Sequence, residues 1–289
     1  MITPTVLRLL FVFIIHGFVA SNADDCECKE HIFCLYPTSK PGPACGDLKN
    51  GGFNAEEKKL ALARINEYRN KVALGKETQG NPGPQPQAAD MMEVTWDDYL
   101  ESTAQRYAEQ CISNKHSSGE CRKTEKYSFG ENLAWGKGQD AKTAYLSHID
   151  AWYGEVKDFP SNIVDSYDPS VVDKSSGIQI GHYAQLVNGK TYEIGCGKTE
   201  WGDENMLVCH FGPTIYREKP LYTRGVPASL CGNDTKSSYE GLCGLGTIGL
   251  ELEVVFGCEQ ESVTEGQASG TKAVINVPMQ DTWAYSNPI

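Results

Sequence analysis

Six histidines are the side chains of this sequence best suited to proton transfer or metal binding near neutral pH. Four of them have ordinary explanations: one lies in a leader-like start, one in a cysteine-rich segment, one beside an apolar helix position and one in a strand-like run. In that order these are His16, His31, His148 and His210, and we interpret His148 as solvated. The remaining two lie in turns near glycines and are our candidate site histidines: His116 and His182.

Two glutamates have settings similar to those of the candidate histidines. Glu131 stands between Gly130 and Asn132, just before an apolar Leu-Ala-Trp run. Glu155 follows Trp152 by three residues on a predicted helix, which places it at the edge of the buried face. Each position by itself equally suits a solvated side chain, so local pattern alone does not join the four residues into one site.

Three helices are predicted ahead of the strands. The first begins at Asn54, whose side chain and that of Glu57 have the spacing of a capping box. The second is predicted to begin at Thr95 with Asp98 as its capping partner. The third is predicted over residues 140–158, with an apolar stripe at helical spacing.

Apolar runs of strand length cluster after the predicted helices. The clearest are TYEIGCG and MLVCHF, at residues 191–197 and 206–211. Helices that come first and strands that come later favour the α+β class over alternating βαβ units. A further alternating run at residues 250–256 is interpreted as a strand in a small C-terminal extension.

The two ends of the chain differ in composition from its middle. Residues 1–23 combine one Arg, a short apolar run and small residues, the pattern of a secretory signal peptide and not of a membrane span. Residues 24–50 form a cysteine-rich arm and residues 226–289 a cysteine-containing extension, on either side of a body at residues 51–225. The one Asn-x-Ser/Thr glycosylation motif begins at Asn233.

Eleven cysteines and a formal net charge of −12 limit the classes of function. In a secreted chain the cysteines indicate a disulfide framework, and their odd number leaves one thiol that is free or pairs with another chain. The acidic balance disfavours nucleic-acid binding, since phosphate contacts need Lys and Arg. No later segment is apolar enough to be a transmembrane anchor, so we expect a secreted, extracellular protein.

Five segments together resemble the CAP superfamily of cysteine-rich secretory proteins, antigen 5 and pathogenesis-related proteins. In chain order they are NPGPQPQAADMMEVTWDDYLESTAQRYAEQC, HSSGECRKTEKYSFGENLAW, AWYGEV, GHYAQLV with IGCG, and VCHFGP. They look most like the antigen 5 branch of arthropod venom and saliva proteins, over about residues 50–225. The resemblance implies an α-β-α sandwich with a central antiparallel sheet. It also implies a cleft lined by a His/Glu tetrad: His116, Glu131, Glu155 and His182.

The resemblance also implies four disulfide pairs. They are Cys45–Cys111, Cys28–Cys121, Cys26–Cys34 and Cys196–Cys209. This leaves an odd set of three cysteines: Cys231, Cys243 and Cys258. Ala228 and Lys236 stand where similar antigen 5 proteins carry further cysteines. The extension therefore departs from the family pattern, and Cys258 is a candidate for a new partner.

Three functions are compatible with such a tetrad. The resemblance implies a non-enzymatic effector that binds a small apolar ligand, such as a sterol or fatty acid, or an extracellular host protein. Alternatively, His116 and His182 bind a divalent metal such as zinc, and Glu131 or Glu155 serves as third ligand or general base of a hydrolase or protease. Without a metal, each Glu would simply orient a His. The chain contains no G-x-S-x-G elbow and no H-E-x-x-H helix, so we favour a protein that is not an enzyme. The third function is a structural extracellular scaffold, and nothing in the sequence sets the oligomeric state.

The segment GHYAQLVNGK, at residues 181–190, departs from the family pattern. Similar proteins have Thr where this chain has Ala184, and Trp where it has Asn188. The resemblance implies a short helix with Gly189 as its C-cap, whereas Asn-Gly alone equally suits a hairpin turn; we favour the helix. Loss of the Trp predicts a roomier or looser cleft, unless a neighbouring aromatic such as Trp201 fills the space.

Overall fold

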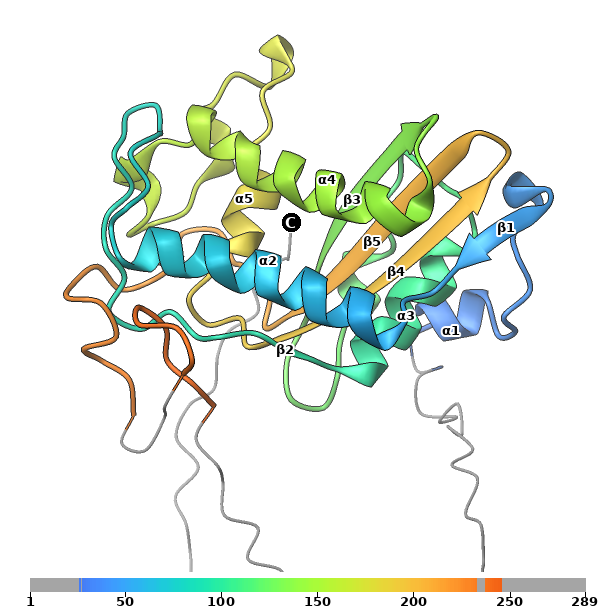
Figure 1. Cartoon of the computed structure of the whole chain (residues 1–289), viewed down its shortest axis with the longest axis horizontal. Helices are drawn as coiled ribbons and strands as arrows, with labels where there is room; N and C mark the ends of the chain where they lie inside the picture. Colours follow the sequence, from blue (N-terminus) through green and yellow to red (C-terminus); the bar gives the residue numbers. More distant parts are fainter. Residues whose placement is uncertain (1–25, 27, 233–236, 246–289) are drawn as a thin grey trace, which may run out of the picture.

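The computed structural model of the chain describes residue 26, residues 28–232 and residues 237–245. The signal peptide predicted at residues 1–23, Asn233, Cys258 and the strand predicted at residues 250–256 lie outside the described residues. Figure 1 shows a sheet between groups of helices. The helices are α1 (Ile32–Leu35), α2 (Ala55–Ala73), α3 (Asp98–Ala108), α4 (Ala141–Gly154) and α5 (Gly181–Leu186).

The described part of the chain contains one sheet of five strands. They are β1 (Leu48–Gly51), β2 (Thr95–Trp96), β3 (Gly130–Lys137), β4 (Glu193–Trp201) and β5 (Glu204–Gly212). The order β1-β4-β5-β3 is antiparallel throughout, and the short β2 pairs parallel to the start of β4. The predicted antiparallel sheet of an α+β fold is confirmed.

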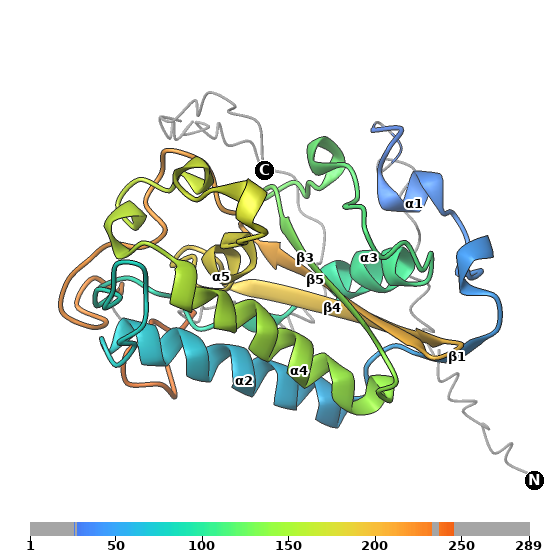
Figure 2. The same ribbon diagram turned by 90° about the horizontal axis from the view of Figure 1, so that it is seen from above.

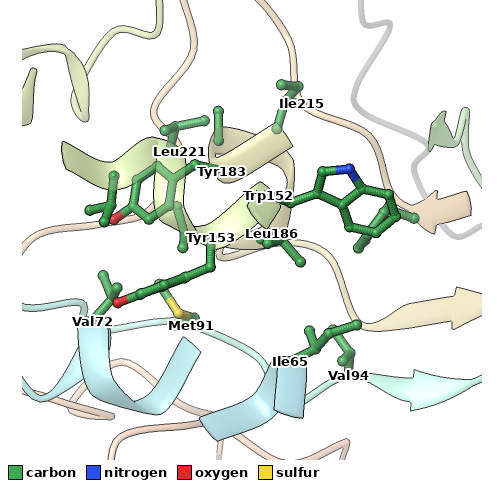
Figure 3. Packing of buried hydrophobic residues seen from close by; sticks show 14 of the residues in the cluster. Ile65, Val72, Met91, Val94, Trp152, Tyr153, Tyr183, Leu186, Ile215 and Leu221 are labelled. Atoms are coloured by element: carbon green, nitrogen blue, oxygen red, sulfur yellow. The ribbon is translucent and has the colours of Figure 1, made fainter. Parts of the chain in front are cut away.

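Helices cover both faces of the sheet, which makes the molecule an α-β-α sandwich. In Figure 2, α2 and α4 lie on one side of the sheet, and α3 and α1 lie on the other. A large apolar cluster fills the first interface, where Tyr153 of α4 and Tyr183 of α5 meet above Val72 of α2 (Figure 3). A smaller cluster, which includes Ile32 and Tyr107, fills the second interface.

Two glycines of β4 allow α3 to lie directly on the sheet. A Cβ atom at Gly195 would lie 2.0 Å from the backbone nitrogen of Glu101, and one at Gly197 would lie 2.2 Å from the Cα of Gln105. Any side chain at either position would therefore push α3 away from a close-packed interface. Side chains alternate along a strand, so Cys196 between them points into the large cluster on the opposite face.

The first predicted helix is confirmed, and the predicted start of the second is wrong. Asn54 and Glu57 form the expected reciprocal capping box of α2. Thr95, by contrast, is the first residue of β2 and bonds across to the chain that leads into β4. Helix α3 begins at Asp98, because the carboxylate of Asp97 accepts the N–H of Leu100. Pairing with β4, which local spacing does not reveal, decides the conformation of Thr95.

Two further element boundaries differ from the sequence prediction. Helix α4 follows its N-cap Asp140 as expected, but it ends at Gly154, and Glu155–Asp158 continues as a 3-10 turn. In the arm, where no periodicity predicted an element, the structure contains α1 and β1. These two elements form because α1 packs on α3 and β1 pairs with β4.

Five disulfides link the described cysteines. They are Cys26–Cys34, Cys28–Cys121, Cys45–Cys111, Cys196–Cys209 and Cys231–Cys243. The first four are the pairs that the resemblance implies, and the fifth joins two members of the odd set. Three of the five tie the arm together or to the body, while the division of the chain into arm, body and extension stays a prediction.

Segment 181–190 contains a helix and no hairpin. Helix α5 ends at Leu186, and Val187 is its C-cap. Gly189 is therefore not the cap that we predicted. It is instead a point of close packing, because a Cβ atom there would lie 2.9 Å from the Cβ of Tyr222.

Candidate functional site

The buried carboxylate of Glu131, on β3, is the centre of a hydrogen-bond network. Its side chain has no exposed surface. Oε1 accepts from Nδ1 of His116 at 2.8 Å and from the N–H of Ser117 at 2.9 Å. Oε2 accepts from the Ser117 hydroxyl at 2.7 Å and from Nε2 of His210 at 3.0 Å. Nη1 of Arg122 lies 3.1 Å from Oε1 as an ion pair, so four hydrogen bonds and one guanidinium group surround this carboxylate.

These donors keep Glu131 ionised. Burial alone would raise the pKa of its carboxyl, but hydrogen bonds from His116 and His210 and the charge of Arg122 outweigh burial and hold this pKa well below its ordinary value. Burial lowers the pKa of His210, and the nearby carboxylate only partly opposes this. Nδ1 of His210 lies 2.8 Å from the hydroxyl oxygen of Thr103, and this hydroxyl donates to the carbonyl of Leu100 at 3.0 Å.

Two histidines and an arginine have roles that the sequence analysis missed. His210 is fully buried, and it belongs to the network because β3 and β5 pair it directly with Glu131. Arg122 is also buried beside the same carboxylate. His148 was interpreted as solvated, but it is half-buried, and its Nε2 lies 2.7 Å from Oδ1 of Asn205. Only the register of β3 against β5, a long-range property, could have identified His210.

The second half of the tetrad joins the end of α4 to the start of α5. Nδ1 of His182 lies 2.6 Å from Oε1 of Glu155, and Oε2 of Glu155 accepts the N–H of Tyr183 at 3.0 Å. The first N–H groups of a helix have no partner within the helix, so Glu155 satisfies one such group of α5. The His182 ring also stacks on Trp152, with ring centroids 6.0 Å apart.

Two cavities meet at the candidate histidines. The larger has a volume of ≈ 710 Å³ and the smaller ≈ 350 Å³. Both are lined by His116, Gln179 and His182, while Glu131 borders the larger and Glu155 the smaller. The four predicted residues thus form two separate Glu–His pairs along two cavities that share both histidines.

The geometry gives the glutamates an orienting role. Each holds Nδ1 of its histidine, and within the described chain neither imidazole Nε2 has a hydrogen-bond partner. A neutral imidazole that donates from Nδ1 keeps the Nε2 lone pair available for a cation. The described residues contain no group of three or more His, Cys, Asp or Glu side chains that could hold an ion, so the histidines would bind one as a pair.

Comparison with known proteins identifies the family. The sequence profile of the cysteine-rich secretory protein family, CAP, matches residues 62–211. The chain belongs to the CAP family. It is 37% identical over 233 residues to "Venom allergen 5" of Polistes dominula, a match over 77% of this chain and 99% of that relative. It is 38% identical over 232 residues to "Venom allergen 3 homolog" of Dinoponera quadriceps, over 74% and 96% of the two chains.

Solved structures show the same fold. Na-ASP-1 superposes with a TM-score of 0.59 at 30% identity, over 71% of this chain and 50% of that one, so this chain spans half of that structure. A crystal structure of NaASP2 with Zn2+ superposes with a TM-score of 0.57 at 29% identity, over 68% of this chain and all of the other. The predicted antigen 5-like CAP affiliation is therefore confirmed.

In this CAP protein, Asn188 lies in a loop beside the wall of the larger cavity. Asn188 is buried and lines neither of the two cavities. Its Nδ2 donates to Oγ1 of Thr191 at 2.9 Å and to the carbonyl of Pro213 at 3.3 Å. Trp201 packs against the smaller apolar cluster and does not replace the missing ring. The side chain therefore makes polar contacts within the loop and one to the carbonyl of Thr214, which lines the larger cavity, and the roomier cleft stays a prediction.

Proposed function

We propose that this CAP protein is a secreted, non-enzymatic effector that binds a small apolar ligand in the larger cavity. The observation that carries the proposal is the composition of its ≈ 710 Å³ wall. Part of this wall is apolar, with Pro169, Val172, Ile178, Ile180 and Ile215, and the rest carries polar side chains that include Glu131 and the two histidines. Small-molecule sites combine apolar surface, which buries the ligand, with convergent polar groups, which orient it, and this cavity offers both.

The hydrogen bonds of the tetrad disfavour hydrolysis. A general base needs a free lone pair that can reach the proton it removes. Four hydrogen bonds occupy the lone pairs of Glu131, and Glu155 is engaged by His182 and by the N–H of Tyr183. The nearby Ser117 hydroxyl donates to Glu131 and not to an imidazole, so it lacks the base that activates a serine nucleophile.

The proposed extracellular location rests on the disulfides and the leader. All cysteines that the structure describes are paired, which requires an oxidising compartment in most organisms. Residues 1–23 have the composition of a secretory signal. No helix of the described chain combines the length and apolarity that a membrane span needs. The relatives are named as venom allergens, which suits a protein that acts outside the cell that makes it, on a host target or its lipids.

Lipid extraction from the secreted protein tests the ligand proposal. The protein is purified from the culture medium of insect cells, extracted with organic solvent and analysed by mass spectrometry. We expect an apolar molecule in near-stoichiometric amount, and we expect His182→Ala to retain it, because the apolar wall is unchanged. Ile180→Asp, which places a charge on that wall, should abolish binding of the apolar molecule. Empty protein in repeated preparations, with no uptake of added sterol or fatty acid, would refute the proposal.

A second candidate function is the binding of a divalent cation. It is supported by the two Nε2 atoms, whose histidines line the same two cavities, and by NaASP2, whose crystal structure contains Zn2+. Calorimetric titration with zinc chloride should show one site that His116→Ala and His182→Ala each weaken, with His148→Ala as a matched control that does not. If zinc-loaded protein also cleaves a peptide library, and His182→Ala abolishes cleavage, the hydrolase function replaces the effector function.

A further inference from the structure

The smaller cavity has a lining that the tetrad does not account for. It lies along the outer edge of β3, the last strand of the sheet, between α4 and the loop of His116. Besides three members of the tetrad, it is bordered by Trp152, by His148 and by Trp135, which is 50% exposed. Aromatic side chains beside a few polar groups are typical of small-molecule sites. The smaller cavity therefore calls for a ligand of its own.

His148 contributes an acceptor nitrogen to this lining and not a positive charge. Asn205 donates from Nδ2 to the carbonyl of Gln139, so its Oδ1 accepts from Nε2 of His148 at 2.7 Å. The proton of the imidazole is therefore on Nε2, and Nδ1, which has no partner within the described chain, retains its lone pair. Burial lowers the pKa of His148, which keeps the ring neutral.

The remaining polar groups of the smaller cavity also favour a positively charged ligand. Among the described residues, its lining has one carboxylate, three imidazoles and two side-chain amides, but no Lys or Arg, whereas the larger cavity includes Arg122. The carboxylate is that of Glu155, which accepts one hydrogen bond at each oxygen, from His182 and from Tyr183, and whose side chain is still 14% exposed. A ligand in this cavity thus meets one negative charge and several acceptors.

We propose that the smaller cavity binds a small organic ammonium ion with an apolar body. The ammonium group donates to Glu155 and to the imidazole nitrogens, and the body lies against Trp135, whose ring face also attracts the cation. The cavity volume of ≈ 350 Å³ is at the lower end of the range for small-molecule sites, which suits a ligand of the size of an arylalkylamine. This inference goes beyond the proposed function, because it concerns a different cavity and a different class of ligand.

Calorimetry with two probes of the same shape tests the charge of the ligand. Protein dialysed against EDTA is titrated in phosphate buffer at pH 8, where an alkylamine is protonated. The probes are 2-phenylethylamine and 2-phenylethanol, which carries a hydroxyl in place of the ammonium group. We expect the amine to bind at least about tenfold more tightly, through a charge-assisted hydrogen bond and a cation–π contact. Equal affinities, or tighter binding of the alcohol, would overturn the inference.

Two variants test the assigned contacts. Glu155→Gln keeps the shape of the side chain and removes its charge, so it should weaken 2-phenylethylamine by about fivefold to tenfold and 2-phenylethanol much less. Trp135→Leu removes the aromatic face and keeps an apolar side chain, so it should also weaken the amine more than the alcohol. Thermal midpoints close to that of the wild type show that both variants are folded.

Glu120→Gln is the matched control. It removes the same charge, but Glu120 lines the larger cavity and not the smaller one. This variant should bind both probes like the wild type. If Glu155 only stabilised the fold, its replacement would weaken both probes equally, and that result would overturn the inference. An equal loss of amine affinity in Glu120→Gln would also overturn it, because the net charge of the protein would then explain the preference for a cation.

Discussion

A carboxylate without solvent contact is stable only if hydrogen-bond donors occupy its lone pairs, and Glu131 accepts four hydrogen bonds and is paired with Arg122. Because its charge is fully compensated in place, it acts as a structural anion that joins β3, β5 and the loop of His116. The orientation of His116 therefore depends on Glu131, whereas the exposed half of that ring remains available to a ligand or cation.

Removal of the Glu131 charge should be strongly destabilising. In Glu131→Gln one acceptor oxygen becomes an NH₂ group that faces donors, and Arg122 loses its buried counter-ion. We expect a loss of about 3–5 kcal/mol in the free energy of unfolding by urea at pH 7. Glu155→Gln is the control, because only two donors contact that partly exposed carboxylate. Similar losses in the two variants would contradict the central role of Glu131.

Acidification should destabilise the protein in two steps. The unfolded imidazole of His210 takes up a proton near pH 6.5, while burial lowers the pKa of the folded group, so protons favour the unfolded chain below about pH 6.5. The folded pKa of Glu131 is also depressed, so its contribution is present above about pH 4.3 and is lost as pH falls further. Thermal midpoints between pH 7.5 and 5.0 should fall less in His210→Gln than in the wild type. If the thermal midpoints of both proteins fell equally over this pH range, His210 would not take up a proton on unfolding.

Much of the tetrad could be predicted from the sequence, because each member lies in a short motif of the CAP family. The residues that complete it could not. His210 contacts Glu131 only because β3 and β5 pair in one particular register, and a shift by one residue would turn it to the other face. The contact between Glu155 and His182 likewise forms because the end of α4 lies beside the start of α5, and no local sequence pattern encodes this arrangement.

At the scale of elements, local signals predicted helix α2 well and tertiary contacts decided the rest. The capping box of α2 is a contact between residues three apart, so it is visible in the sequence. The strand conformation of Thr95 and the existence of β1 both depend on pairing with β4, far along the chain. Errors therefore occur where a short segment takes its conformation from a distant strand.

The contact of α3 with β4 gives a prediction at this scale. Gly195→Ala places a Cβ atom 2.0 Å from the backbone of Glu101, so the helix must move, at an expected cost of about 1–3 kcal/mol. In Gly154→Ala, the control, the Cβ atom meets nothing within 4 Å and the backbone at φ −60° is helical, so stability should stay equal or rise slightly. Urea unfolding of both variants is the measurement. If Gly195→Ala had the same free energy of unfolding as the wild type, the packing of α3 on β4 would not require glycine at this position.

At the scale of the whole molecule, the disulfides hold distant segments together. Cys28–Cys121 joins the arm to the loop that carries His116 and Arg122, across 93 residues of sequence, whereas Cys231–Cys243 closes only 12. A cross-link restricts the unfolded chain more when the loop it closes is longer. The arm is thus tied covalently to the loop of the site, in addition to the packing of α1 on α3 and the pairing of β1 with β4.

The two disulfides should therefore contribute unequally to stability. On the chain-entropy account, the nested Cys45–Cys111 bond shortens the effective loop of Cys28–Cys121, so the double variant Cys28→Ala/Cys121→Ala should lose about 3.5 kcal/mol, and Cys231→Ala/Cys243→Ala about 3 kcal/mol. Urea unfolding of both proteins measures the difference. The first variant should also weaken zinc or lipid binding, because Cys121 precedes Arg122 and positions the loop that carries His116. Equal losses in the two variants would mean that strain or residual structure, and not loop length, sets the contribution of these bonds. Unchanged binding would show that the Glu131 network holds this loop without the arm.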